Sequence, residues 1–285
     1  MPDSYLRYRK IIPLLTDPAS HGGNPEDAFD VIVPSLPGFG FSSRPKYPGV
    51  NNFRVAEMWV KLMTEELGYS KFAAAGGDMG SGVTRYLAAN HPERLYGIHL
   101  TDIGIIRDLI ASSDQAMLSK EERQYKNNAS AWMAQEGGYM SIQSTRPQTL
   151  AYGLSDSPVG LAGWMTEKFR SWSDCNGDLA QKFSEDELLT HIMVYWVTNT
   201  IGSTGHMYYE NAHSLPAIGY IEVPTGLALF PADILLPPKE WAMRNLNVTR
   251  WTSMPRGGHF TALEEPDLFA DDIRAFFRPF RTKSW

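Results

Sequence analysis

The chain has 285 residues, of which 43% are hydrophobic and 20% charged, and its formal net charge is −6. This composition is that of a globular protein with a sizeable core, and an acidic chain without a long basic run argues against nucleic acid as the main partner. The single cysteine, Cys175, cannot form an internal disulfide, and no apolar stretch reaches the ~20 residues of a membrane span. The first residues lack the apolar core of a signal peptide, so we expect a cytoplasmic location.

Helix and strand signals alternate over the first hundred residues. Short apolar runs predict strands at 29–36, 71–78 and 95–102. Helical spacing of apolar residues predicts helices at 5–15, 53–68 and 81–92. This alternation predicts βαβ units around a mainly parallel sheet.

The pattern changes after the third predicted strand, where strand signals fade and helical segments rich in Trp, Tyr and Met take over. Strand signals return at 223–230 and 250–255, and the chain ends on a predicted helix at 265–280. The sequence therefore predicts an α/β core in two parts with a helical insertion between them. The expected boundaries are 1–105 for the first part of the core, 106–215 for the insertion and 216–285 for the second part of the core.

Asp78 stands at a predicted strand-to-helix junction, in the stretch GGDMGS. Small residues on both sides permit the sharp turn of a nucleophile elbow, usually written G-x-S-x-G, with Asp in place of Ser. The N–H groups at the start of the following helix attract an anion, and a carboxylate nucleophile forms an ester with an electrophilic carbon. An aspartate that only caps the helix after a glycine turn has the same pattern. The residues alone leave both roles open.

His259 follows two glycines in MPRGGHFTALEEP, so its side chain is free either to point into a site or to lie in an ordinary surface loop. The chain order of Asp nucleophile, insertion, acid and C-terminal His is that of the α/β hydrolases. Two carboxylates are candidates to orient His259: Asp233, after the strand that follows the insertion, and Asp102, after the strand that precedes it. Each also fits an ordinary strand end or helix cap. The pattern alone favours Asp233 only slightly.

Several separated motifs together resemble the microsomal-type epoxide hydrolases of the α/β-hydrolase superfamily. In the family's order, they are IIPLLTDP, VPSLPGFGFS, GGDMGS, GYMSIQSTRPQT, SDSPVGLAGW, VPTGLALFP and RGGHFTALEEPDLFADDI. The resemblance runs from about Ile11 to Phe277. It implies an α/β-hydrolase fold whose helical insertion is a lid. Residue by residue, it identifies Asp78 as the nucleophile, His259 as the base and Asp233 as the acid.

The resemblance also assigns two lid tyrosines, Tyr139 in GGYMSIQ and Tyr208 in GHMYYENA. A phenol, whose ordinary pKa is about 10, donates a hydrogen bond to an epoxide oxygen and protonates the alkoxide as the ring opens. Tyr209 is adjacent to Tyr208 and offers an alternative register. Packing within the lid is the alternative role for all of these rings.

The activity implied by the resemblance is hydrolysis of a small lipophilic epoxide to a vicinal diol through an ester of Asp78, with the Met79 N–H as an oxyanion donor. Neither a metal nor an organic cofactor is expected, and PGFGFS lacks the third glycine of a dinucleotide fingerprint and the lysine of a P-loop. The sequence is compatible with a homodimer as well as with a monomer.

Haloalkane dehalogenases also use an Asp nucleophile, but in that family the next residue is a Trp that binds the halide. Met79 therefore argues against dehalogenation.

One departure from the family lies at the beginning of the sequence. The family carries an H-G-x-P motif whose backbone N–H completes the oxyanion hole, and here MPDS begins where its proline should be. The family's first strands lie further upstream, so we expect a truncated or misassigned start, unpaired strand edges and impaired activity. The sequence leaves open whether a membrane anchor lies upstream of residue 1. A non-catalytic ligand-binding protein and a fragment that does not fold alone are the alternative hypotheses.

Overall fold

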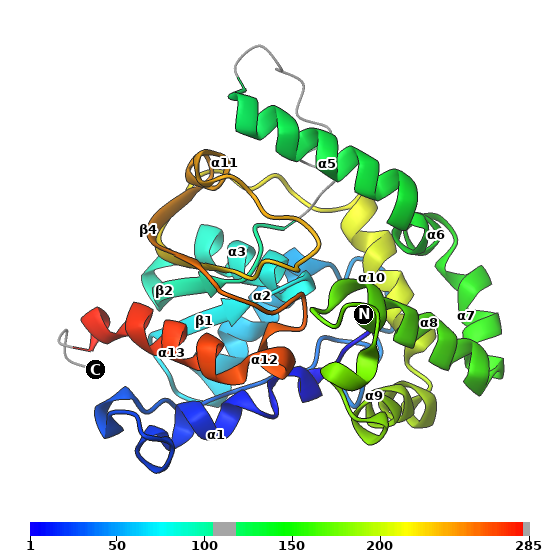
Figure 1. The fold of residues 1–285 in the computed structure, drawn as a ribbon, viewed down its shortest axis with the longest axis horizontal. Helices are drawn as coiled ribbons and strands as arrows, with labels where there is room; N and C mark the ends of the chain where they lie inside the picture. Colours follow the sequence, from blue (N-terminus) through cyan, green and yellow to red (C-terminus); the bar gives the residue numbers. More distant parts are fainter. Residues whose placement is uncertain (105–117, 282–285) are drawn as a thin grey trace.

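The computed structural model describes residues 1–104 and 118–281, and its core is a four-stranded sheet in which every neighbouring pair of strands is parallel (Figure 1). The strands lie in chain order: β1 (Phe72–Gly76), β2 (Leu95–Leu100), β3 (Ile221–Leu229) and β4 (Leu246–Ser253). Ile98 and His99 are neighbours on β2 whose side chains point to opposite faces, and both are fully buried, as expected for a parallel sheet that is covered on both faces. Four of the five predicted strands are thereby confirmed, β4 beginning earlier than predicted.

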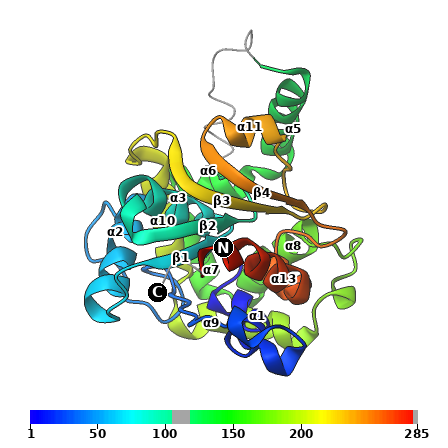
Figure 2. The ribbon, with the colours of Figure 1, turned by 90° about the vertical axis from the view of Figure 1, so that its left-hand side faces the viewer.

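Helices cover both faces of the sheet (Figure 2). The helices on one face are α2 (Asn52–Lys61) and α3 (Met79–Asn90); those on the other are α1 (Ile11–Thr16) and α13 (Pro266–Phe277). Successive side chains of a strand point to opposite faces, so Leu227 joins the core beneath α3 while Ala228 joins the core beneath α13. The sequence-predicted helices therefore exist, although residues 5–15 are divided into a 3₁₀ turn and α1.

A buried polar cluster ties α13 to the sheet. His99 Nε2 of β2 lies 2.8 Å from Asp272 Oδ2 of α13, and Arg250 Nε and Thr252 Oγ1 of β4 donate to Asp272 Oδ1 at 2.8 and 2.7 Å. Burial tends to raise the pKa of Asp272, but the hydrogen bonds from His99 and Arg250 outweigh it and lower this pKa to about 2. Asp272 is therefore an ionised carboxylate with three partners.

Residues 118–220, the described part of the chain between β2 and β3, contribute helices that gather to one side of the sheet (Figure 1). They are α5 (Lys120–Glu136), α6 (Gly138–Thr145), α7 (Pro147–Asp156), α8 (Pro158–Trp172), α9 (Glu185–Thr198) and α10 (Ile201–His213). The predicted start of this insertion, near residue 105, lies outside the described residues, and the three predicted domain boundaries stay predictions. The described chain also has two short helices, α11 (Lys239–Met243) and α12 (Thr261–Glu264), and a π turn at Leu62–Glu66. Its 3₁₀ turns are Tyr5–Tyr8, Pro18–His21, Pro25–Asp27, Pro92–Arg94, Leu179–Gln181 and Arg278–Phe280.

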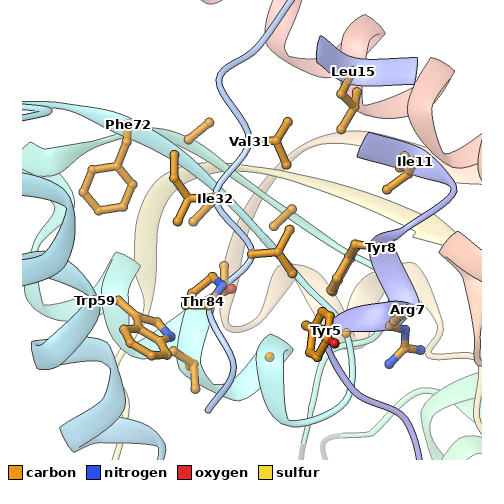
Figure 3. Close-up of a pocket in the computed structure, with 18 of the residues that line it drawn as sticks. Tyr5, Arg7, Tyr8, Ile11, Leu15, Val31, Ile32, Trp59, Phe72 and Thr84 are labelled. Atoms are coloured by element: carbon orange, nitrogen blue, oxygen red, sulfur yellow. The ribbon is translucent and has the colours of Figure 1, made fainter. Parts of the chain in front are cut away.

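The predicted strand at 29–36 is wrong: this segment has no ladder partner in the described structure. Its apolar residues suit a strand, but a strand also needs a hydrogen-bonded neighbour, and here the segment and β1 are separated by a cavity of about 700 Å³. Val31 and Ile32 of this segment and Phe72 of β1 all line the cavity (Figure 3). Within the described sheet β1 pairs with β2 alone, and Ala75 of β1 is exposed.

Candidate active site

Asp78 occupies the turn between β1 and α3 with a φ of 54° and a ψ of −125°, which is unusual for a residue other than glycine. Gly76 and Gly77 precede it, and a Cβ on either would collide, at Gly76 with the Gly80 carbonyl and at Gly77 with the Thr101 hydroxyl. The glycines therefore allow the chain to bend tightly enough to lift Asp78 off the end of the strand. Such backbone strain is found mostly at functional sites.

His259 joins Asp78 to Asp233 through hydrogen bonds from its two ring nitrogens. Nδ1 lies 2.8 Å from Asp233 Oδ1, and Nε2 lies 3.1 Å from Asp78 Oδ2. The side chains of His259 and Asp233 are 6% and 4% exposed, while that of Asp78 is 22% exposed. The structure thus assembles the three residues predicted as base, acid and nucleophile from three loops that are far apart in the sequence, with the nucleophile candidate the most accessible.

The protonation states of this trio follow from its charges. Burial lowers the pKa of His259, but the charge and hydrogen bond of Asp233 and the hydrogen bond of Asp78 outweigh it and raise this pKa to about 10. Burial likewise raises the pKa of Asp78, but the positive charges of the Met1 amino group, His259 and Arg7 hold it well below its usual range. At neutral pH the free site therefore holds a protonated His259 beside an ionised Asp78.

Asp102 lies in the same site but has different partners. Its Oδ2 accepts the backbone N–H of Asp78 at 2.6 Å, and its Oδ1 accepts the N–H of Gly104 at 2.9 Å. Burial, followed by the charge of Asp233, raises the pKa of Asp102 to about 6. The structure thus places Asp102 against the main chain of the nucleophile candidate and Asp233 against the imidazole of His259.

The predicted oxyanion donor, the N–H of Met79, lies at the first position of α3. It donates to Oδ1 of Asp78 at 2.6 Å, so it already contacts the carboxyl group on which an oxyanion would form. The N-terminal end of α3 adds the partial positive charge of its helix dipole.

Tyr139 of α6 and Tyr208 of α10 face this trio across a cavity of about 150 Å³. The two rings meet edge to face, with centroids 6.0 Å apart, and both side chains are buried. Burial, supplemented by the charge of Asp78, raises the pKa of both phenols well above the ordinary value, so both hydroxyls keep their protons. Tyr209 is 40% exposed and stacks on His213, so it is Tyr208 that lines the cavity.

All six sequence-predicted site residues line this cavity, namely Asp78, Met79, Tyr139, Tyr208, Asp233 and His259. Its wall also has apolar side chains from Ile234 and Leu235, which suit an apolar ligand.

Sequence reasoning missed two groups of the site. Asn211 donates to Asn52 Oδ1 at 3.0 Å in the cavity wall, and the buried Arg7 donates to the backbone carbonyl of His259. The Asn51–Asn52 pair before a helix was a usable signal for the first group; nothing in the local sequence singles out Arg7.

Within residues 1–104 and 118–281, no group of three or more His, Cys, Asp or Glu side chains is placed to hold a metal ion. Among the helices described, none combines the length and apolar character needed to cross a bilayer.

Comparison with known proteins gives three findings. The family model for the alpha/beta hydrolase fold matches residues 1–136. A protein of Stigmatella aurantiaca is 44% identical over 283 residues, and epoxide hydrolase 1 of Oryctolagus cuniculus is 39% identical over 300 residues; these alignments cover 99% and 96% of this chain but only 63% and 66% of the relatives. The crystal structure of juvenile hormone epoxide hydrolase from the silkworm Bombyx mori superposes with a TM-score of 0.85 at 28% identity, over 100% of this chain and 71% of that one. The chain thus spans slightly less than two thirds of the length of these curated relatives.

Proposed function

Because the chain belongs to the microsomal-type epoxide hydrolases of the α/β-hydrolase fold, we propose that it hydrolyses a lipophilic epoxide to a vicinal diol through an ester of Asp78. The family resemblance and the fold predicted from the sequence are confirmed by these likenesses. The observation that carries the proposal is the hydrogen-bonded chain from Asp78 through His259 to Asp233, which shares one cavity with two buried tyrosines.

The first step opens the epoxide ring. The protonated hydroxyls of Tyr139 and Tyr208 donate hydrogen bonds to the epoxide oxygen, and ionised Asp78 attacks a ring carbon from the opposite side. A carbon–oxygen bond forms to Asp78 while the ring carbon–oxygen bond breaks. The electron pair of the broken bond goes to the epoxide oxygen, which takes a proton from a tyrosine. The cavity between the tyrosines and Asp78 supports this geometry.

Ester formation changes the protonation state of His259. The negative charge of Asp78 disappears when the ester forms, and Asp78 is one of the two carboxylates that raise the His259 pKa. The imidazolium becomes a stronger acid and gives up a proton, which restores the tyrosine. A neutral imidazole, the form needed for a general base, is therefore produced only after the nucleophile has reacted.

The second step hydrolyses the ester. Neutral His259 takes a proton from a water, which attacks the carbonyl carbon of the Asp78 ester, while Asp233 stabilises the imidazolium that forms. The N–H of Met79 donates to the tetrahedral oxyanion. The intermediate collapses by breaking the carbonyl carbon–oxygen bond to the diol, and the leaving oxygen takes a proton from the imidazolium. Asp78 is released as a carboxylic acid with one oxygen from water, and its proton passes to neutral His259, which restores the carboxylate and the imidazolium of the free site.

The test is to trap the ester. His259→Gln, which lacks the base, is mixed with a styrene-type oxide and digested, and the peptide that contains Asp78 is weighed. The expected result is a mass gain equal to the epoxide, localised to Asp78, that persists in the variant and turns over in the wild type. A variant that melts cooperatively and gains no mass would refute the proposed nucleophilic mechanism.

A further inference from the structure

The loop that carries His259 is hydrogen-bonded along its main chain to the end of α8. The N–H of His259 donates to the carbonyl oxygen of Trp172 at 2.8 Å, and the N–H of Gly257 donates to Asp174 Oδ2 at 2.9 Å. A Cβ on Gly258 would lie 2.6 Å from the Trp172 carbonyl oxygen and 2.8 Å from the Asp174 nitrogen. The two segments therefore approach each other more closely than a larger residue at position 258 would permit.

Glu264 of α12 binds both of these segments. Its Oε2 accepts the N–H of Gly258 at 3.0 Å and that of Asp174 at 2.8 Å, while its Oε1 accepts the N–H of Phe260 at 2.9 Å. One carboxylate thus holds the residues immediately before and after His259. Glu264 is 9% exposed, so these hydrogen bonds are shielded from water. Hydrogen bonds to an ionised carboxylate are stronger than those between neutral groups.

The imidazole of His259 also rests on the same lid segment. The Trp172 ring meets the His259 ring edge to face, with centroids 5.4 Å apart. Trp172 in turn lies beside Tyr139, with ring centroids 5.2 Å apart. The end of α8 therefore contacts both the candidate base and a candidate epoxide-binding tyrosine.

We propose that Glu264 is a positioning residue that locks the His259 loop onto the end of α8, so that the lid fixes the position of the base. The inference rests on the proposed function, because it concerns the step in which His259 activates water. Asp78 stands on a separate loop, between β1 and α3, and the two tyrosines stand on α6 and α10. Loosening the Glu264 clamp should therefore slow ester hydrolysis selectively and leave ester formation nearly unchanged.

The adjacent residue, Glu265, provides a matched control. It is also buried, at 7% exposure, but its carboxylate pairs with Lys182 and Arg256, each at 2.8 Å. Arg256 stands at the start of the His259 loop, but among the described hydrogen bonds Glu265 accepts none from the backbone N–H groups of residues 257–260. Substituting Glu265 thus removes a buried carboxylate of the same loop region without removing the clamp.

The experiment compares wild type, Glu264→Gln and Glu265→Gln in single-turnover reactions with a styrene-type oxide. Samples are quenched at successive times, and the alkylated fraction of the Asp78 peptide is measured by mass. For Glu264→Gln we expect ester formation within about twofold of wild type and ester hydrolysis slowed about 10- to 100-fold, since a displacement near 1 Å costs up to about 100-fold. Glu265→Gln should change neither rate, even where it lowers the melting temperature.

Equal slowing of both steps in Glu264→Gln, or no slowing, would overturn the proposal. If Glu264→Gln does not melt cooperatively, Asp174→Ala takes its place, because it removes the acceptor of the Gly257 N–H and keeps its own backbone N–H for Glu264. The same selective slowing is expected there, and equal slowing overturns the proposal. A wild type that forms no ester would instead refute the proposed function, so the two failures are distinguishable.

Discussion

Replacing Asp233 by Asn tests the roles of the two acids that the sequence left as rivals. The asparagine oxygen still accepts the Nδ1–H of His259, so the 2.8 Å contact and the ring orientation are kept while the charge is lost. In Asp102→Asn, the matched control, the charge is removed from a group that accepts the Asp78 N–H and makes no hydrogen bond to His259 in the described structure. The pair of variants therefore separates support of the base from support of the nucleophile's main chain.

The size of the effect follows from the pKa of His259. Its rise from 6.5 to about 10 corresponds to roughly 5 kcal/mol in favour of the imidazolium, and Asp233 is the largest contributor that raises it. An imidazolium forms in the transition state of ester hydrolysis, but no such charge develops on His259 during ring opening. In a serine-protease triad the same Asp-to-Asn change costs about 10⁴-fold. We expect ester hydrolysis in Asp233→Asn to slow by about 10³- to 10⁴-fold and ester formation by less than about tenfold.

The assay is the quenched single turnover with mass detection of the Asp78 peptide, run across pH 6 to 9. Asp233→Asn should accumulate the ester, whereas Asp102→Asn should slow hydrolysis by less than about tenfold. Melting curves for both variants control for unfolding. A larger hydrolytic defect in Asp102→Asn than in Asp233→Asn would refute the reasoning and transfer the acid role to Asp102.

Three further predictions concern the tyrosines, the pH dependence of stability and the sheet. Tyr139→Phe and Tyr208→Phe should each slow ester formation by about 10²-fold or more and leave hydrolysis of a preformed ester within about twofold, measured in the same single-turnover reactions; equal effects on both steps would contradict their role as acids. Because the folded pKa of His259 is raised to about 10, its contribution to stability is complete below pH 6.5 and is lost as pH rises through 10. The melting temperature of wild type should thus fall more steeply between pH 7 and 10 than that of His259→Gln, and parallel curves would contradict the assignment. Asp272→Asn should lower the free energy of unfolding by about 3–5 kcal/mol, because His99 and Arg250 lose a buried anionic partner, while kcat stays within about twofold; denaturant titration measures the first and diol formation the second.

The sequence could single out Asp78 and His259 as candidates because their signals are local. Both follow paired glycines at the ends of predicted strands, and the structure shows why: Gly76 and Gly258 each stand where a side chain would collide with neighbouring backbone. Asp102 and Asp233 could not be separated by such patterns. They follow β2 and β3, which are adjacent in the sheet, so both reach the same site, and only the direction of each carboxylate distinguishes them.

Long-range pairing explains what the sequence could not give. Residues 29–36 have the composition of a strand, but whether a strand forms depends on a neighbour that local composition cannot specify. Glu264 was missed for a related reason. An acidic residue in a short helix usually faces water, and its three backbone partners come from the His259 loop and from Asp174, which is 90 residues away in the sequence.

The open edge of β1 has a consequence for the order in which the protein loses structure and activity. Within the described sheet, the strand that precedes Asp78 is hydrogen-bonded on one side, to β2, and a cavity of about 700 Å³ flanks its other edge. Local opening starts where few buried contacts hold the backbone, so β1 should fray before β2 or β3. Under mild denaturation the molecule would then form an inactive, partly opened species whose exposed strand edge invites pairing with another chain. Inactivation would precede global unfolding, and aggregation would begin at the nucleophile's own strand.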